Sequence, residues 1–155
     1  MIMVQMSERA WTLKAIHLAC TLARGTNTGV ALVKMLPVQH LGWLGTEFGY
    51  QNFTQQDHLE LRDYLATAED YAVEVSTHVF QYATLYDAIA DAANYVKASI
   101  VFANIPDSRI PYWHKFQIWS LRQRLISHQQ KLYMLDTPIE TSTHEHWSDE
   151  PLLIR

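Results

Sequence analysis

The chain has 155 residues, of which 48% are hydrophobic and 18% are charged, and its formal net charge is −4. This composition excludes a disordered chain and fits one globular domain that is large enough to bury a core. Broad binding to DNA or RNA needs clustered lysine and arginine, and the only local cluster is Arg122, Arg124 and Lys131. We therefore expect no nucleic-acid partner.

The cellular location is predicted from three absences in the sequence. The single cysteine, Cys20, excludes an internal disulfide and lies in a helical pattern, where we expect a small buried side chain. No apolar run approaches the roughly 18 residues of a membrane-spanning helix. The N-terminal segment 1–4 is too short for a signal peptide and lacks a basic start. These features predict a cytoplasmic protein without membrane insertion.

The N-terminal third of the chain begins with a strand pattern and continues with a helix pattern. Residues 1–6 form a short apolar run, and Ser7 after it is a candidate N-cap whose hydroxyl could accept an early helix N–H. Apolar residues then recur with helical spacing from Trp11 to Ala23. Gly25 and the polar stretch that follows it predict the end of this helix.

A second strand and a second helix follow, separated by a long loop. Residues 30–36 are nearly all apolar and suit a central parallel strand that is covered on both faces. The segment 40–53 contains glycines and aromatic residues and is predicted to be a loop. Either Asn52 or Thr54 could cap the next helix, and Asp57 would complete a capping box with Thr54.

The remaining elements continue the same alternation. Residues 73–79 alternate with a period of two, which predicts a strand with one wetter face near a sheet edge. Three further elements complete the series before the last strand: a helix at 84–96, a strand at 99–103 and a helix at 112–127. The final strand is predicted at 131–135.

The order β-α-β-α-β-α-β-α-β defines the expected architecture. Strict alternation predicts a parallel sheet with right-handed crossovers and helices on both faces. We therefore expect a Rossmann-like, three-layer α/β/α sandwich with a five-stranded parallel sheet over residues 1–136. Residues 137–155 are polar, contain two prolines and are predicted to form a C-terminal tail. The apolar group Leu152-Leu153-Ile154 could dock this tail on the domain.

Several segments resemble the universal stress protein family. Residues 4–7 read Val-Gln-Met-Ser, where that family often has Val-Asp-Gly-Ser, and residues 15–24 look like its first helix. Residues 30–38 look like its second strand with a proline-containing turn, and 84–101 are similar to its third helix and fourth strand. The resemblance covers about residues 1–136 and implies an adenine nucleotide alpha hydrolase-like fold.

The ATP-binding loop of that family is the part that this sequence lacks. The family's first-strand aspartate, which contacts the nucleotide, aligns with the neutral Gln5. Its Gly-x-x-Gly and Gly-Ser or Gly-Thr loop aligns with residues 103–114, which contain no glycine. Pro106 and Pro111 remove backbone donors there, and Asp107 adds negative charge where phosphates would lie. The resemblance thus implies a branch that has lost conventional ATP binding.

A ligand crevice is still expected at the usual place for such folds. In open α/β sheets, ligands bind outside the carboxyl ends of strands where the strand order reverses. This rule selects Gln5, Ser7, Pro37, Val38, His40, Ala103, Asn104, Ser108 and Arg109. The predicted ligand-binding residues among them are Gln5, Ser7, Val38, Asn104, Ser108 and Arg109. The alternative is that all of these are ordinary loop residues.

No residue pattern supports catalysis or a metal site. His144-Glu145-His146 is a tight set, but a metal site needs three or four ligands, so we interpret it as a solvated part of the tail. His17 and His128 are interpreted as packed or surface residues. His114 attracts more interest because we expect its loop to face the crevice, yet it has no identifiable nucleophile as a partner. Walker, Gly-x-Ser-x-Gly and HExxH motifs are absent.

Aromatic residues favour an interaction role over catalysis. Trp43, Phe48, Tyr50 and Phe53 crowd one loop, and a second group lies at 112–119. Most of these will pack inside the protein, but tyrosine and tryptophan also supply binding energy at protein interfaces. We therefore expect a protein partner.

The resemblance also implies an assembly and a set of functions. Dimers of that family often form by antiparallel pairing of their last strands. Residues 131–136 would supply this strand here, and we expect a homodimer because an apolar edge strand invites pairing. The leading hypothesis is a non-enzymatic stress-response or regulatory homodimer without a cofactor. One alternative is a sensor that binds a nucleotide or anion through Ser7, Asn104, Ser108 and Arg109. Another is a soluble regulatory domain associated with a membrane transporter.

Overall fold

The computed structural model describes residues 1–38, 53–106 and 111–135. Strands and helices alternate along these residues: β1 (Ile2–Met6), α1 (Arg9–Thr26), β2 (Val30–Pro37), α2 (Gln55–Asp70), β3 (Val75–Tyr82), α3 (Leu85–Tyr95), β4 (Ile100–Phe102), α4 (Pro111–Ser127) and β5 (Lys131–Tyr133). The five strands form one parallel sheet with the order β3-β2-β1-β4-β5. The predicted α/β fold class is therefore confirmed.

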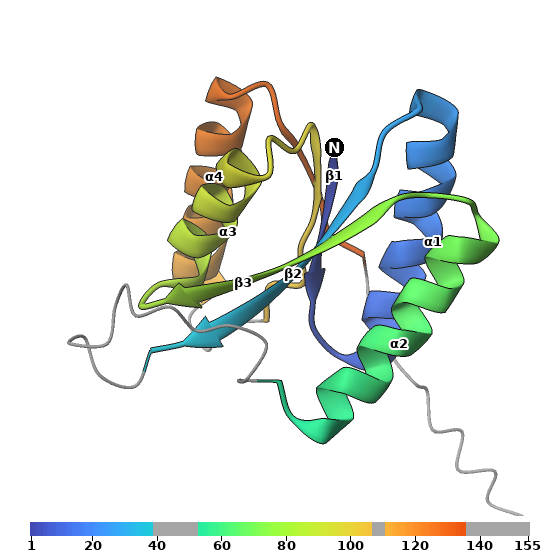
Figure 1. Cartoon of the computed structure of the whole chain (residues 1–155). Coiled ribbons are helices and arrows are strands. Elements are labelled where there is room, and N and C mark those ends of the chain that lie inside the picture. The colour runs from blue at the N-terminus through green and yellow to red at the C-terminus, as the bar shows by residue number, and fades with distance from the viewer. Residues whose placement is uncertain (39–52, 107–110, 136–155) are drawn as a thin grey trace, which may run out of the picture.

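The sheet lies between two helical layers. Helices α1 and α2 cover one face, and α3 and α4 cover the other (Figure 1). Alternate residues of β1 enter opposite apolar cores: Val4 packs in the cluster under α1 and α2, whereas Met3 packs in the cluster under α3 and α4. Burial on both faces explains why the central strands are continuous apolar runs instead of alternating ones.

The two outer strands are β3 and β5. All eight residues of β3 are half-buried, as expected for a strand near an edge. The strand runs from Val75 to Tyr82, so it starts two residues later and ends three residues later than the alternating pattern at 73–79 predicted. The reason is its partner, because β3 pairs with β2 along the whole length of that strand, from Val30 to Pro37.

The sequence predicted both ends of α1 wrongly. Ser7 is not the N-cap, since Glu8 occupies that position and makes no side-chain cap bond. The helix also continues through Gly25 to Thr26. The left-handed residue that ends the helix is Asn27, with a φ of 52°, and its N–H donates to the carbonyl of Ala23. Asparagine tolerates this conformation better than most residues do.

The capping box at the start of α2 is confirmed with Thr54 as the N-cap. The Thr54 hydroxyl accepts from the N–H of Asp57 at 3.1 Å, and the Asp57 carboxylate accepts from the N–H of Thr54 at 2.9 Å. The same carboxylate forms an ion pair with Lys34 of β2. Burial alone would raise the pKa of Asp57, but hydrogen bonds from Lys34 and Thr54 outweigh burial and lower it. This pair connects α2 to β2, the neighbour of the central strand β1.

Candidate functional site

The strand order places the switch point of the sheet between β1 and β4. The strand order shows that the chain moves outward from β1 to β2 and β3, and then returns to the other side of β1 to place β4 and β5. The carboxyl ends of β1 and β4 therefore lie side by side at the point where the strand order reverses. Ser7 follows β1 and Asn104 follows β4 by two residues, so both lie at this point.

Asn104 links the two strand ends by hydrogen bonds. Its backbone N–H donates to Oε1 of Gln5 at 3.0 Å, and its side-chain Nδ2 donates to Oγ of Ser7 at 2.9 Å. Gln5 is buried, with 5% of its surface exposed, whereas Asn104 is half-buried. Three of the six residues predicted to bind a ligand are thus brought together in one network. The role of this network in ligand binding stays a prediction.

The other predicted residues lie elsewhere or outside the described residues. Val38 follows β2, and its N–H donates to the carbonyl of Tyr82 at 2.9 Å, so it extends the pairing with β3. Ala103 is buried next to Asn104, and Pro37 is exposed at the end of β2. His40, Ser108 and Arg109 lie outside the described residues.

Thr12 belongs to the same network, although it was not among the residues predicted from the sequence. It is buried in the first turn of α1, and its Oγ1 accepts from the N–H of Ser7 at 2.9 Å. The bond gives a partner to the backbone N–H of Ser7, which precedes the helix. A polar residue within the buried stripe of α1 was the available signal, because buried hydroxyl groups need partners.

Cys20 and His114 are the described side chains with reactive groups that the sequence singled out. Cys20 is fully buried, as predicted, and its burial raises the pKa of the thiol, which disfavours the nucleophilic thiolate. His114 lies in the first turn of α4, where its Nδ1 is 3.4 Å from the hydroxyl of Tyr86. The described residues contain no group of three or more His, Cys, Asp or Glu that could hold a metal ion.

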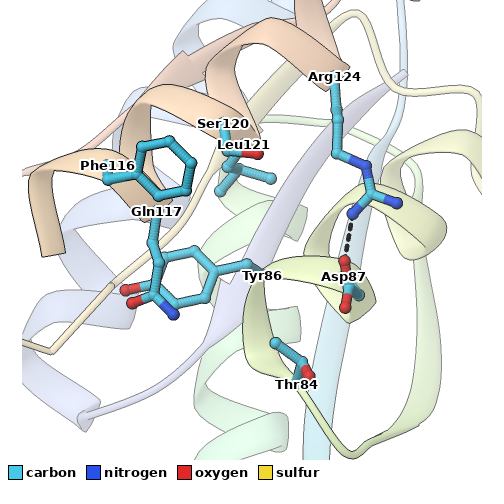
Figure 2. Close-up of a pocket in the computed structure, with 8 residues that line it drawn as sticks. All are labelled: Thr84, Tyr86, Asp87, Phe116, Gln117, Ser120, Leu121 and Arg124. Atoms are coloured by element: carbon cyan, nitrogen blue, oxygen red, sulfur yellow. Dashed lines mark hydrogen bonds and ion pairs between the residues drawn. The ribbon is translucent and has the colours of Figure 1, made fainter. Parts of the chain in front are cut away.

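Two hollows lie on the described surface away from this network. One, of about 140 Å³, lies between α3 and α4, and Figure 2 shows Tyr86, Phe116 and the ion pair between Asp87 and Arg124 around it. The other, of about 400 Å³, lies beside Gly29 and the loop before β3. Neither hollow is lined by a residue predicted to bind a ligand, so the switch point between β1 and β4 stays the candidate site.

Together these features define a doubly wound parallel α/β domain with a polar network at its switch point. No family model matches the chain, and no curated protein matches it. Solved structures do match. A universal stress protein in complex with cAMP has 12% identity and a TM-score of 0.54, and the match covers 87% of this chain and 96% of that one.

Two further structures agree with the first. A universal stress protein family member from Burkholderia pseudomallei has 14% identity and a TM-score of 0.55, covering 88% of this chain and 96% of that one. A universal stress protein from Archaeoglobus fulgidus has 17% identity and a TM-score of 0.53, covering 87% and 92%. The fold of this chain is therefore the universal stress protein fold, which agrees with the resemblance seen in the sequence.

Over the described residues, no helix has the length and apolar character needed to cross a bilayer.

Proposed function

We propose that this chain is a universal stress protein-like regulatory domain that acts without catalysis and does not bind ATP in the conventional way. The fold supports the general class, and the chemistry of the switch point supports the loss of ATP binding. The hydrogen-bond donors of Asn104 carry this proposal, because they lie where a phosphate-binding loop would present its own donors.

A phosphate cradle needs backbone N–H groups that are free to point at the ligand. The N–H of Asn104 instead donates to Gln5, and the side-chain amide of Asn104 donates to Ser7. Pro106, two residues further on, has no N–H to offer. Gln5 is neutral, so it also cannot act as a charged acceptor for sugar hydroxyl groups. The network therefore uses the two donors of Asn104 to hold the ends of β1 and β4 together. A nucleotide would have to break these bonds to reach the same donors.

A sensor of a small nucleotide or anion is the second candidate. Its support is the same trio of polar side chains at the switch point, where open α/β sheets bind ligands. The universal stress protein solved with cAMP has the same fold at 12% identity. As a sensor, the chain would bind a ligand that takes over the hydrogen bonds of Asn104, and binding would then release the ends of β1 and β4 from each other.

We expect millimolar ATP with magnesium to leave the melting temperature of the full chain unchanged. A ligand present at about 100 times its Kd would stabilise the native state by about 2.7 kcal/mol, which a thermal-shift scan detects easily. A concentration-dependent rise with ATP would contradict the proposal. The same scan with AMP, cAMP and inorganic phosphate tests the sensor. A rise that Asn104→Ala and Ser7→Ala both abolish would favour that candidate.

The proposal includes a homodimer through β5. This strand is the last in the sheet, and the described residues place no strand on its outer side. Lys131 and Tyr133 direct backbone groups toward the residues that flank β4. The N–H of Lys131 donates to the carbonyl of Ser99, and the carbonyl of Tyr133 accepts from the N–H of Ala103. In such a ladder the backbone N–H and carbonyl of the intervening Leu132 point away from β4, where a second copy could pair.

Replacing Leu132 by proline is expected to convert the dimer to a monomer, because it removes that outward donor and keeps the bonds to β4. Leu132→Ala is the matched control, since it loses the same side-chain packing but keeps the N–H. Light scattering coupled to size-exclusion chromatography measures the mass of each variant. Equal masses for the proline and alanine variants would mean that β5 does not form the interface.

A further inference from the structure

Helix α4 exposes an aromatic face that nothing in the described structure covers. Tyr112, Phe116, Trp119 and Ile126, here called the aromatic stripe, are 86%, 54%, 57% and 61% exposed. Their spacing of four, three and seven residues places them along one side of the helix. The opposite side packs Leu121, which is 1% exposed, into the core. A helix that is apolar on both sides is normally covered on both sides.

The rings of this face form a continuous surface. The Trp113 and Phe116 centroids are 5.8 Å apart and the rings are stacked, and Phe116 and Trp119 follow at 5.9 Å. Figure 2 shows Phe116 at the rim of the hollow between α3 and α4. Contiguous exposed apolar surface of this kind marks an interaction site, because single scattered apolar residues are normal but a row of aromatic residues is not.

The charge of α4 indicates which kind of segment would cover it. The helix contains Lys115, Arg122 and Arg124 and no aspartate or glutamate. Lys115 and Arg122 are exposed along one flank of the aromatic stripe, and Arg124 on the other flank forms an ion pair with Asp87 of α3. The surface therefore fits an apolar segment that carries acidic residues.

We propose that the C-terminal segment 137–155 of the same chain is this occupant. Residues 137–155 contain four acidic residues and one arginine, so this segment carries a formal charge of −3 out of the chain's net −4. They end with the apolar group Leu152-Leu153-Ile154, preceded by Asp149 and Glu150. In the proposed contact the apolar group covers the aromatic stripe, and the two carboxylates lie against Lys115 and Arg122.

The described geometry allows the segment to reach this face. Strand β5 lies beside β4 and ends at the carboxyl edge of the sheet, which is also the edge where α4 begins. An extended chain spans up to about 3.5 Å per residue, so the stretch from Leu135 to Leu152 can cover roughly 60 Å. A domain of this length has a radius of gyration of only about 15 Å. The whole of α4, about 25 Å long, is therefore within range.

Two other occupants fit the charges less well. A second copy that presented its own α4 would bring Lys115 and Arg122 against the same residues of its partner, and like charges in contact repel. A membrane with anionic lipids would meet α3 as well as α4, because the two helices cover the same face of the sheet (Figure 1). It would then contact Asp87 and Asp91, which are both exposed.

The test follows the indole N–H signals of Trp113 and Trp119 by NMR in the full chain. A tail variant carries Leu152→Ser, Leu153→Ser and Ile154→Ser, and a helix variant carries Lys115→Glu and Arg122→Glu. We expect both to shift the two indole signals relative to the wild-type chain and to raise the fluorescence of a hydrophobic dye. Trp11 reports on folding, since its indole is 2% exposed and donates to the carbonyl of Leu135.

A synthetic peptide of residues 137–155 should restore the wild-type signals of the tail variant. Its affinity for a protein that carries the tail and helix substitutions together should be at least about tenfold weaker. Lys14→Glu with Arg24→Glu, on exposed positions of α1, is the matched control and should leave peptide binding unchanged. The proposal is overturned if the tail variant leaves both indole signals unshifted. It is also overturned if the aromatic stripe of the wild-type chain becomes exposed when the protein is diluted to the monomer, since a second copy would then be the occupant. A third contrary result is that anionic phosphatidylserine vesicles, and not the peptide, restore the indole signals of the tail variant.

Discussion

Replacing Trp11 by alanine is expected to lower the free energy of unfolding by about 3–5 kcal/mol, the range for a large buried aromatic side chain. The indole is 2% exposed within the core under α1 and α2. Its Nε1 also donates to the carbonyl of Leu135 at 3.2 Å, a bond between residues that are 124 positions apart. The side chain therefore joins the first helix to the segment that leaves β5. Urea denaturation followed by circular dichroism measures the loss.

Trp11→Phe separates packing from hydrogen bonding. Phenylalanine keeps most of the apolar contact and removes the donor, so we expect a loss of about 1–2 kcal/mol that includes the unpaired carbonyl of Leu135. Tyr95→Ala is a control at an aromatic residue that is 68% exposed and lies outside the aromatic stripe. If Trp11→Ala were no more destabilising than Tyr95→Ala, the indole of Trp11 would not be part of the core.

Stability should fall steeply between pH 10 and pH 12 because of Tyr64. Burial, reinforced by the nearby Glu60 carboxylate, raises the pKa of this phenol to about 12, against an ordinary value of 10.0. The hydroxyl donates to Oε2 of Glu60 at 3.2 Å, and the residue is fully buried in the core of α1 and α2. The unfolded chain loses its proton near pH 10 while the folded chain keeps it. Stability is therefore fully present below pH 10 and is lost as the pH rises through the folded pKa.

The size of this effect follows from the shift. Two pKa units correspond to at most about 2.7 kcal/mol. Tyr64→Phe should remove this part of the pH dependence, although it also loses the bond to Glu60 at neutral pH. Tyr95→Phe, at a tyrosine that is 68% exposed, is the matched control and should keep the slope of the wild-type chain. Chemical denaturation at several pH values measures all three proteins, and parallel curves for Tyr64→Phe and wild type would exclude this role of Tyr64.

Local sequence patterns predicted the architecture because each element depends mainly on its own residues. The continuous apolar run of β2 predicts a strand covered on both faces, and Val30 and Val33 are indeed buried on opposite faces of the sheet. The capping box of α2 spans only Thr54 to Asp57, so the sequence contains the whole motif. Ser7 failed as a predicted cap for the opposite reason. Its hydroxyl accepts from Asn104, a residue 97 positions away that no local pattern reveals.

By itself, the sequence determined the alternation of elements, the parallel sheet and the lack of a glycine-rich phosphate loop, since these follow from periodicity and composition. Only the tertiary structure decided that Gln5, Ser7 and Asn104 share hydrogen bonds, because the strand order brings the ends of β1 and β4 together. It also decided which side of α4 faces solvent. Apolar residues such as Phe116 and Leu121 occur on both sides of that helix, so periodicity does not distinguish the buried side from the exposed one, and packing against the sheet makes the choice.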